Sequence, residues 1–287
     1  IARFWKRRFY RIYPAVWVQL AILIALLPIP PPSNADLFRN LALWVNLPPW
    51  MTPPINGVWW TLPVELGFYL LLPLLILIQR KIGWVPLLIG SMALTLTWRG
   101  GSILLIERED NASLLTILDS LPGTLFTFVA GLSLAFIPWQ PTLRQRRLSL
   151  LLVILIFFAL LHWLRISADN YWKDHWILVI WHPLMALVIA TGVYLLLTPP
   201  PEYNLLTSKP FVWLGEVSFG IYLWHFPVLQ NLLAHWPDAW NTVPMSALAL
   251  LLILAITLPI AALSFYLIER PIMGWGKHPN PHDSLPP

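Results

Sequence analysis

The N-terminal end of the chain carries a cluster of side chains suited to binding phosphate. An apolar run from residue 12 to residue 30 follows the cluster at once. Guanidinium groups bind phosphate through paired hydrogen bonds, so the cluster suits lipid headgroups or a phosphate-bearing donor. Arg8 and Arg11 are three residues apart, which places both on one face of a helix. The positive residues of the cluster are Arg3, Lys6, Arg7, Arg8 and Arg11.

A carboxylate followed one helical turn later by a phenol forms a second candidate group. Glu65 lies just inside an apolar run, and Tyr69 follows it at i+4. Charged groups inside a bilayer are costly, so each of them is a functional candidate. Glu65 can act as a base or anchor a polar acceptor, and it can equally be a carboxylate at the water interface.

A histidine lies at a comparable depth in a later apolar run. Ser218, Tyr222 and His225 follow i, i+4, i+7 spacing and share one helical face. Such a polar stripe normally faces the interior of a helix bundle or a water-filled cavity. The stripe supports either a catalytic His225 or an interhelical hydrogen bond, and the spacing does not show whether His225 meets Glu65.

Two further titratable positions favour a structural interpretation. His182 precedes Pro183, where a hydrogen bond at a helix kink is expected. Glu269, Arg270 and Pro271 close the last apolar run, and they are predicted to form an interfacial ion pair with a helix stop. The sequence contains no phosphate loop, no His-Glu-x-x-His motif and no metal-ligand cluster, so no bound metal is expected.

The composition indicates what kind of molecule must position these residues. Of 287 residues, 58% are hydrophobic and 11% are charged, and the mean hydropathy is +0.68. A soluble domain carries roughly 25% charged residues, so the chain is predicted to be an all-α integral membrane protein. Many of the 18 Trp residues lie at the ends of apolar runs, as in an interfacial aromatic belt. The absence of Cys excludes disulfides and thiolate chemistry.

Apolar runs long enough to cross about 30 Å of hydrocarbon predict a bundle of about eight transmembrane helices. With the N-terminus inside, most of the 18 Lys and Arg residues, among them Arg146, are predicted to lie in inner loops, and a minority, among them Arg99, in outer loops. The positive-inside rule therefore predicts N-in and C-in. The same rule accounts for the net charge of +5 without nucleic acid. The runs are 13–30, 60–78, 82–98, 116–137, 148–164, 176–197, 211–233 and 246–268.

The remaining segments complete the predicted organisation. The outer loop 31–59 is rich in proline and is not expected to form regular helix. Residues 1–273 are predicted to form one membrane domain, and the polar tail 274–287 is expected to be disordered. The chain starts at Ile1 rather than at Met, which is typical of a fragment whose upstream part is missing.

Four sequence elements, in order and over nearly the whole chain, resemble the acyltransferase 3 family of membrane acyltransferases. Each motif alone is weak, but together with the predicted topology they are fairly specific. The elements are Arg8-Phe9-Tyr10-Arg11-Ile12-Tyr13-Pro14, Trp60-Thr61-Leu62-Pro63-Val64-Glu65 with Phe68-Tyr69, Gly215 to Ser218 with Tyr222-Leu223-Trp224-His225-x-Pro227, and Glu269-Arg270-Pro271.

This resemblance implies a ten-span domain of the inner (plasma) membrane. Such a domain moves an acyl group, often acetyl, from acyl-CoA to a hydroxyl of a carbohydrate or lipid-linked glycan, with acyl-CoA as co-substrate and no tightly bound cofactor. The first two family spans, which carry its principal histidine, are not in this chain, so the fragment alone is expected to be inactive. The implied roles are donor binding by Arg8 and Arg11, catalysis by Glu65 and His225, a substrate cavity lined by Trp60, Tyr69, Ser218 and Tyr222, and a structural role for Glu269 and Arg270.

Two other functions stay open at this point. A transporter or glycan flippase would use the same polar stripe as a path, and a glycan polymerase also joins many spans to a large outer loop. Against a transporter, the two halves of the chain show no matching pair of Gly- or Pro-broken helices. An acyl-transfer assay separates these functions from the first.

Overall fold

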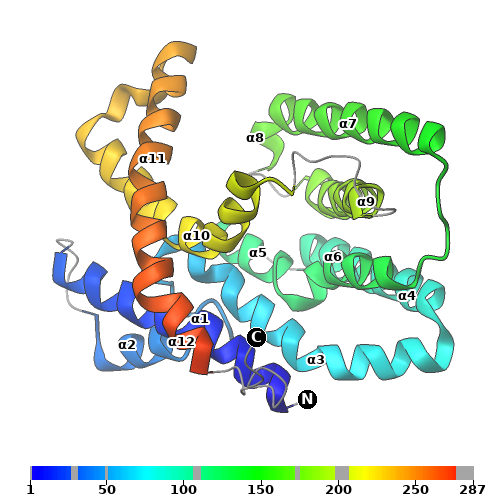
Figure 1. The fold of residues 1–287 in the computed structure, drawn as a ribbon, viewed down its shortest axis with the longest axis horizontal. Coiled ribbons are helices and arrows are strands. Elements are labelled where there is room, and N and C mark those ends of the chain that lie inside the picture. Colours follow the sequence, from blue (N-terminus) through cyan, green and yellow to red (C-terminus); the bar gives the residue numbers. More distant parts are fainter. Residues whose placement is uncertain are drawn as a thin grey trace, which may run out of the picture. The chain divides into compact units, whose positions relative to one another are not determined.

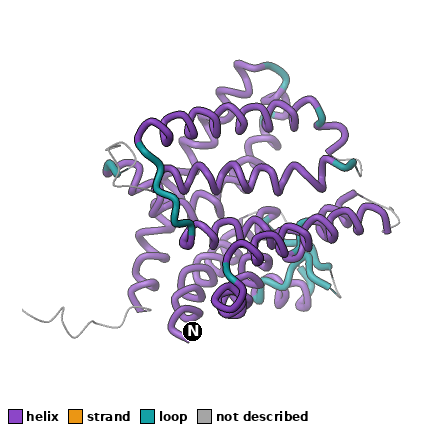
Figure 2. The backbone as a smooth tube through the Cα atoms, turned by 90° about the vertical axis from the view of Figure 1, so that its right-hand side faces the viewer, coloured by secondary structure: helices purple, strands orange, loops and turns teal. Residues whose placement is uncertain are grey.

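The computed structural model describes residues 2–26, 32–48, 51–105, 111–171, 175–197 and 207–275. Within these ranges every regular element is a helix (Figure 1), and Figure 2 shows a described backbone of helices joined by loops, without strands. The predicted all-α class is therefore confirmed. The chain forms two compact units, of which the first comprises Ile1–Pro63 and Asn204–Pro287 and the second comprises Val64–Tyr203.

Three long helices dominate the first unit, and each of them contains a proline. Proline is tolerated in membrane helices where neighbouring groups satisfy the carbonyl that it leaves unpaired. α10 and α11 pack closely at Gly220, where a Cβ atom would lie 2.9 Å from the carbonyl oxygen of Ala261. The described elements are α1 (Ala2–Leu26), α2 (Asn34–Leu41), η1 (Gly57–Trp60), α10 (Lys209–His235), η3 (Pro237–Trp240), α11 (Val243–Ser264), the π turn η4 (Phe265–Glu269) and α12 (Arg270–Trp275).

The second unit is a set of helices that pack through apolar side chains. Buried Leu75, Leu87 and Val129 join α3, α4 and α6 in one core cluster. A second cluster around Leu118 and Ile177 joins α5 to α9. The described elements are α3 (Thr61–Ile82, which starts at the end of the first unit), α4 (Trp84–Leu105), α5 (Asn111–Leu118), α6 (Leu121–Ser133), η2 (Leu134–Phe136), α7 (Leu143–Ile166), α8 (Ala168–Tyr171) and α9 (Ile177–Leu197).

Six helical segments of the described chain are long and apolar enough to cross a membrane. Their outer faces suit lipid rather than water, since Leu151, Leu155 and Phe158 on α7 are 54%, 58% and 62% exposed. The chain is thus a multi-pass membrane protein. The segments are Ala2–Leu26, Gly57–Ile82, Trp84–Leu105, Leu143–Ile166, Ile177–Leu197 and Val243–Trp275.

The other two predicted spans also fall on helices. The predicted span 116–137 is divided between α5 and α6, because Pro122 has no amide hydrogen to bond the carbonyl of Leu118. The predicted span 211–233 lies within α10, which has 27 residues. The count of eight spans and the N-in, C-in orientation stay predictions.

The loop 31–59 does contain regular helix, so that prediction was wrong. α2 lies between the prolines, which are all outside it, and Ser33 caps its first turn by accepting a hydrogen bond from the amide of Asp36. The Ser33 hydroxyl also donates to the Asp36 carboxylate, and this bond is the main reason why the pKa of Asp36 lies below its usual value. Arg39 pairs with the same carboxylate at 3.2 Å. The predicted disordered tail lies outside the described residues from residue 276 onward.

Arg146 was predicted to lie in an inner loop, but it belongs to α7 and is only 2% exposed. Its Nε donates to the carbonyl oxygen of Leu195 at 2.6 Å, and its Nη2 donates to that of Leu196 at 3.3 Å. These carbonyls lie in the last turn of α9, where a positive charge is favoured by the helix dipole. Arg146 therefore caps α9.

Replacing Arg146 by Met is expected to lower the free energy of unfolding by about 1–3 kcal/mol, because the carbonyls of buried Leu195 and of Leu196 lose this donor. Thermal unfolding in detergent measures the effect. Arg147, the exposed neighbour on the same helix, supplies the control. Equal effects of R146M and R147M would show that the cap contributes nothing.

Candidate active site

The predicted donor-binding arginines meet at a cleft in the first unit. The cleft has a volume of about 250 Å³ and is lined by Arg7, Arg8 and Arg11 together with Phe4 and Met273. The arginines come from successive turns of α1, because spacings of three and four residues bring side chains onto one face. The guanidinium group of Arg8 lies 5.3 Å from the ring centre of Phe4, a cation–π contact that holds it in place. The cleft combines positive charge with apolar walls.

Glu269 does not form the predicted interfacial ion pair, and the helix does not stop there. Glu269 is 3% exposed and accepts a hydrogen bond from the Ser264 hydroxyl at 3.0 Å. No Glu269–Arg270 ion pair occurs within the described part of the chain, and Arg270 instead lies 5.7 Å from the ring centre of Tyr266. The backbone passes through the π turn η4 directly into α12, so Pro271 takes an early position of a new helix, where its missing amide hydrogen is tolerated. The positive charge of Arg11 acts on the Glu269 carboxylate through space, which links this turn to the arginine cleft.

His225 is held by the backbone of its own helix. Its Nδ1 lies 2.8 Å from the carbonyl oxygen of Tyr222 and 3.1 Å from that of Ile221. Both of these partners are acceptors, so Nδ1 must carry a hydrogen. In the neutral ring the lone pair is therefore on Nε2, which is the atom able to accept a proton.

Of the predicted polar stripe on α10, Tyr222 and His225 lie together, and Ser218 forms no hydrogen bond with either of them in the described structure. The Tyr222 hydroxyl donates to the carbonyl of Val58 and lies 2.6 Å from the Thr61 hydroxyl, and the Tyr222 and His225 rings are neighbours with centres 6.2 Å apart. Ser218 is exposed and donates to the carbonyl of Gly215, one turn back on the same helix. Tyr222 and His225 thus form one site in the first unit, and Ser218 makes only a local contact.

The remaining predicted site residues lie on or near the start of α3. Glu65 accepts a hydrogen bond from the Tyr69 hydroxyl one turn later, as their spacing predicts. Both residues belong to the second unit, so the described contacts do not bring them together with His225. Trp60 ends η1 in the first unit and is 38% exposed.

Sequence reasoning missed a buried amide cluster beside His225. Gln19 and Asn56 both donate to the carbonyl oxygen of Leu223, at 2.6 and 2.9 Å, and Trp59 donates to the Gln19 side chain at 3.0 Å. The three side chains are at most 1% exposed. The signal that could have found this cluster is Gln19 itself, a polar amide in the middle of an apolar run.

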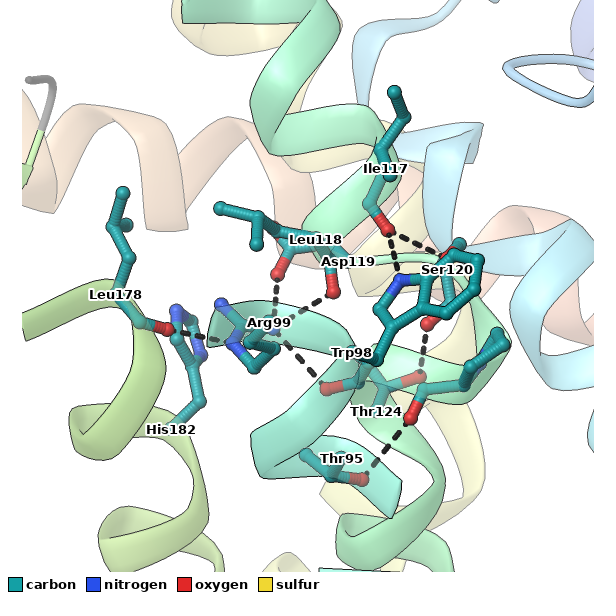
Figure 3. Close-up of polar contacts among 12 residues, drawn as sticks. Thr95, Trp98, Arg99, Ile117, Leu118, Asp119, Ser120, Thr124, Leu178 and His182 are labelled. Carbon is teal, nitrogen blue, oxygen red and sulfur yellow. Dashed lines mark hydrogen bonds and ion pairs between the residues drawn. The ribbon is translucent and has the colours of Figure 1, made fainter. Parts of the chain in front are cut away.

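A second polar network lies in the second unit around Arg99, which was predicted to be in an outer loop but belongs to α4 and is 0% exposed (Figure 3). Its Nε donates to the carbonyl of Leu178 at 2.6 Å. Its Nη1 donates to the carboxylate of Asp119 and to the carbonyl of Leu118, both at 2.9 Å, and to the carbonyl of Gly123 at 3.2 Å. Arg99 thereby ties α4 to α9 and to the break between α5 and α6.

His182 forms the hydrogen bond expected beside Pro183. Its Nε2 lies 3.1 Å from the hydroxyl of Tyr171 on α8, close to the Arg99 network in Figure 3. Burial and then the negative charge of Asp119 raise the pKa of Tyr171, so its hydroxyl keeps its proton and is available as a donor. Within the described ranges no group of three His, Cys, Asp or Glu side chains could hold a metal ion.

The structure is that of a multi-pass helical membrane protein with a positively charged cleft, and the comparisons identify its class. The family model described as an acyltransferase domain matches residues 1–266, so the chain belongs to the acyltransferase 3 family. It is an acyltransferase domain, and the resemblance seen in its motifs is confirmed. No solved structure matches the chain.

Three relatives illustrate the match. The chain is 26% identical over 311 residues to the peptidoglycan O-acetyltransferase OatA of Listeria monocytogenes, covering 95% of this chain and 46% of the relative. It is 28% identical over 307 residues to nodulation protein 10 of Rhizobium leguminosarum bv. viciae, covering 95% and 75%. It is 24% identical over 317 residues to the O-acetyltransferase OatA of Staphylococcus aureus, covering 95% and 47%. The chain thus spans about half the length of the OatA relatives.

Proposed function

We propose that this domain transfers an acetyl group from acetyl-CoA to a hydroxyl group of a cell-surface carbohydrate. The observation that carries the proposal is the arginine cleft of α1 in a member of the acyltransferase 3 family. The names of the OatA relatives support acetyl as the acyl group and a cell-wall glycan as the acceptor class.

The donor binds with its phosphates against Arg7, Arg8 and Arg11. Coenzyme A carries several phosphate charges beside an adenine ring, and the cleft offers guanidinium groups beside the aromatic ring of Phe4. The positive-inside rule supports placing this end of α1 in the cytoplasm, where acyl-CoA is found, and the domain in the inner membrane. Coenzyme A is too polar to cross the bilayer, so its phosphates stay at the inner face.

The acceptor hydroxyl reacts near His225. The lone pair of Nε2 takes the proton of the hydroxyl as the oxygen attacks the acyl carbon of the acetyl thioester. The new C–O bond forms while the C–S bond breaks, and the coenzyme A thiolate leaves and takes up that proton as the free thiol. Tyr222 and the exposed Trp60, both in the first unit, provide walls for a sugar ring.

Replacing both Arg8 and Arg11 by Ala in the full-length protein is expected to raise the KM for acetyl-CoA roughly tenfold or more, because charge-assisted bonds to phosphate are lost. Acetyl transfer to a glycan acceptor in membrane vesicles measures the change, and the effect of R8A/R11A should weaken at high salt. Arg3, an exposed residue of the same helix outside the cleft, supplies the control.

Two results would count against the proposal. An unchanged KM in the double variant would remove the donor from this cleft. A wild-type protein that moves a lipid-linked glycan across the membrane without transferring acetyl would instead support the flippase alternative.

A further inference from the structure

Pro227 leaves one carbonyl of α10 without its helical partner. In a regular helix the carbonyl of Leu223 would accept a hydrogen bond from the amide of residue 227, but proline has no amide hydrogen. Gln19 Nε2 from α1 and Asn56 Nδ2 from the segment before η1 both donate to that oxygen instead, at 2.6 and 2.9 Å. The carbonyl that Pro227 leaves without a helical donor is thus satisfied from outside α10.

The donors are themselves fixed in place. The Gln19 Oε1 atom accepts bonds from Asn56 Nδ2 at 3.2 Å and from Trp59 Nε1 at 3.0 Å. With Gln19 0% and Asn56 1% exposed, neither side chain can exchange its partners for water. The network therefore specifies a single position for the Leu223 carbonyl.

The same segment, residues 56–61, contacts α10 on both sides of Leu223. The Val58 carbonyl and the Thr61 hydroxyl hold the hydroxyl of Tyr222. A Cβ atom at Gly57 would lie 2.6 Å from the ring of Phe226, so only glycine permits this close approach. The contacts of residues 56–61 therefore lie on both sides of His225 along α10. The Nδ1 atom of His225 itself bonds the carbonyls of residues 221 and 222.

We propose that Gln19 and Asn56 are positioning residues. They hold the turn of α10 that precedes Pro227, so that Nε2 of His225 points at the acceptor hydroxyl. This inference rests on the proposed function for its catalytic consequence. The geometry that it assigns can be tested without catalysis.

The test separates positioning from simple satisfaction of the free carbonyl. Gln19→Leu removes one of the two hydrogen-bond donors to the Leu223 carbonyl and leaves only Asn56. Pro227→Ala restores the amide hydrogen of residue 227. In Q19L/P227A the helix backbone itself can therefore donate to the Leu223 carbonyl. If the amides only satisfy the carbonyl, kcat and the modification rate of His225 recover together with stability in the double variant. If the amides position His225, only stability recovers.

Three quantities are measured on the full-length protein: the thermal unfolding midpoint, kcat for acetyl transfer, and the rate at which diethyl pyrocarbonate modifies His225, followed by mass spectrometry. We expect Q19L to lower the unfolding midpoint and to change the modification rate of His225. We also expect it to lower kcat at least about tenfold, since a displacement of the His225 side chain by about 1 Å has that effect. In Q19L/P227A the midpoint should return in part, because the buried Trp59 Nε1 still lacks the acceptor that Gln19 supplied, while kcat and the modification rate should stay at their Q19L values. The matched control Q19L/P259A removes a proline of α11 instead and should recover neither.

Recovery of kcat and of the modification rate together with the midpoint in Q19L/P227A would overturn the proposal. A Q19L variant with unchanged kcat and unchanged modification rate would also overturn it. If Q19L does not fold, Q19L/P227A is compared directly with the wild type and decides the question. If the wild-type protein transfers no acetyl, the modification rate still reports the position of His225, so failure of the proposed function is distinguished from failure of this inference.

Discussion

Replacing His225 by Gln is expected to lower the rate of acetyl transfer by roughly 10²–10⁴-fold, the range for loss of a general base. The reason is the arrangement of the ring, whose Nδ1 is bonded to the carbonyls of Ile221 and Tyr222, so that the basic lone pair is on Nε2. Gln keeps a polar side chain of similar reach but has no atom that accepts a proton near neutral pH. The KM for acetyl-CoA should be unchanged, because the donor binds at the arginine cleft of α1.

His235 supplies a matched control for this experiment. It lies on the same helix, and its Nδ1 makes the same kind of contact with a backbone carbonyl, that of Asn231, at 2.9 Å, but its side chain is exposed. H235Q should retain wild-type transfer. A transfer rate for H225Q within about threefold of the wild type would exclude His225 as the general base and leave Glu65 as the other candidate for that role.

Replacing Arg99 by Met is expected to destabilise the second unit by about 3–5 kcal/mol, the cost of removing one partner of a buried ion pair. Arg99 is fully buried, and the Asp119 side chain is 13% exposed, so water cannot replace the guanidinium group. The carbonyls of Leu118, Leu178 and Gly123 would lose a donor in the same step.

Unfolding in detergent, followed by loss of helical circular dichroism, measures the change, and R165M at an exposed position of α7 serves as the control. The double variant R99M/D119N should regain part of the loss, because it removes the unpaired carboxylate but not the unsatisfied carbonyls. A full recovery would assign the whole effect to the charge. No loss in R99M would mean that the network does not stabilise the unit.

Several predictions made from the sequence depended on local properties and were confirmed. Hydrophobic runs of about twenty residues can satisfy their backbone in lipid only as helices, so the all-α membrane class followed from composition and length. The spacing of Arg8 and Arg11 brought them to one cleft because both lie on a single helix. The Glu65–Tyr69 contact followed from the i+4 rule for the same reason.

Predictions that assigned charged residues to loops failed where long-range partners were involved. Arg99 was predicted in an outer loop and Arg146 in an inner loop, because both lie just outside the predicted apolar runs. Each is buried, because carbonyl oxygens from a helix distant in the chain satisfy its guanidinium group. The partners lie 79 and 49 residues away, so no local pattern records them.

The sequence by itself therefore determined the class of the protein, the positions of its long apolar helices, the shared face of Arg8 and Arg11, and the family. These depend on hydrophobicity and helical periodicity, which act over a few turns, and on motifs within single segments. Only the tertiary structure decided that Gln19 and Asn56 bond the carbonyl freed by Pro227, and that the Nδ1 of His225 bonds backbone carbonyls. A buried polar group must find a partner wherever the fold brings one within about 3 Å, and that partner is chosen by packing rather than by position in the chain.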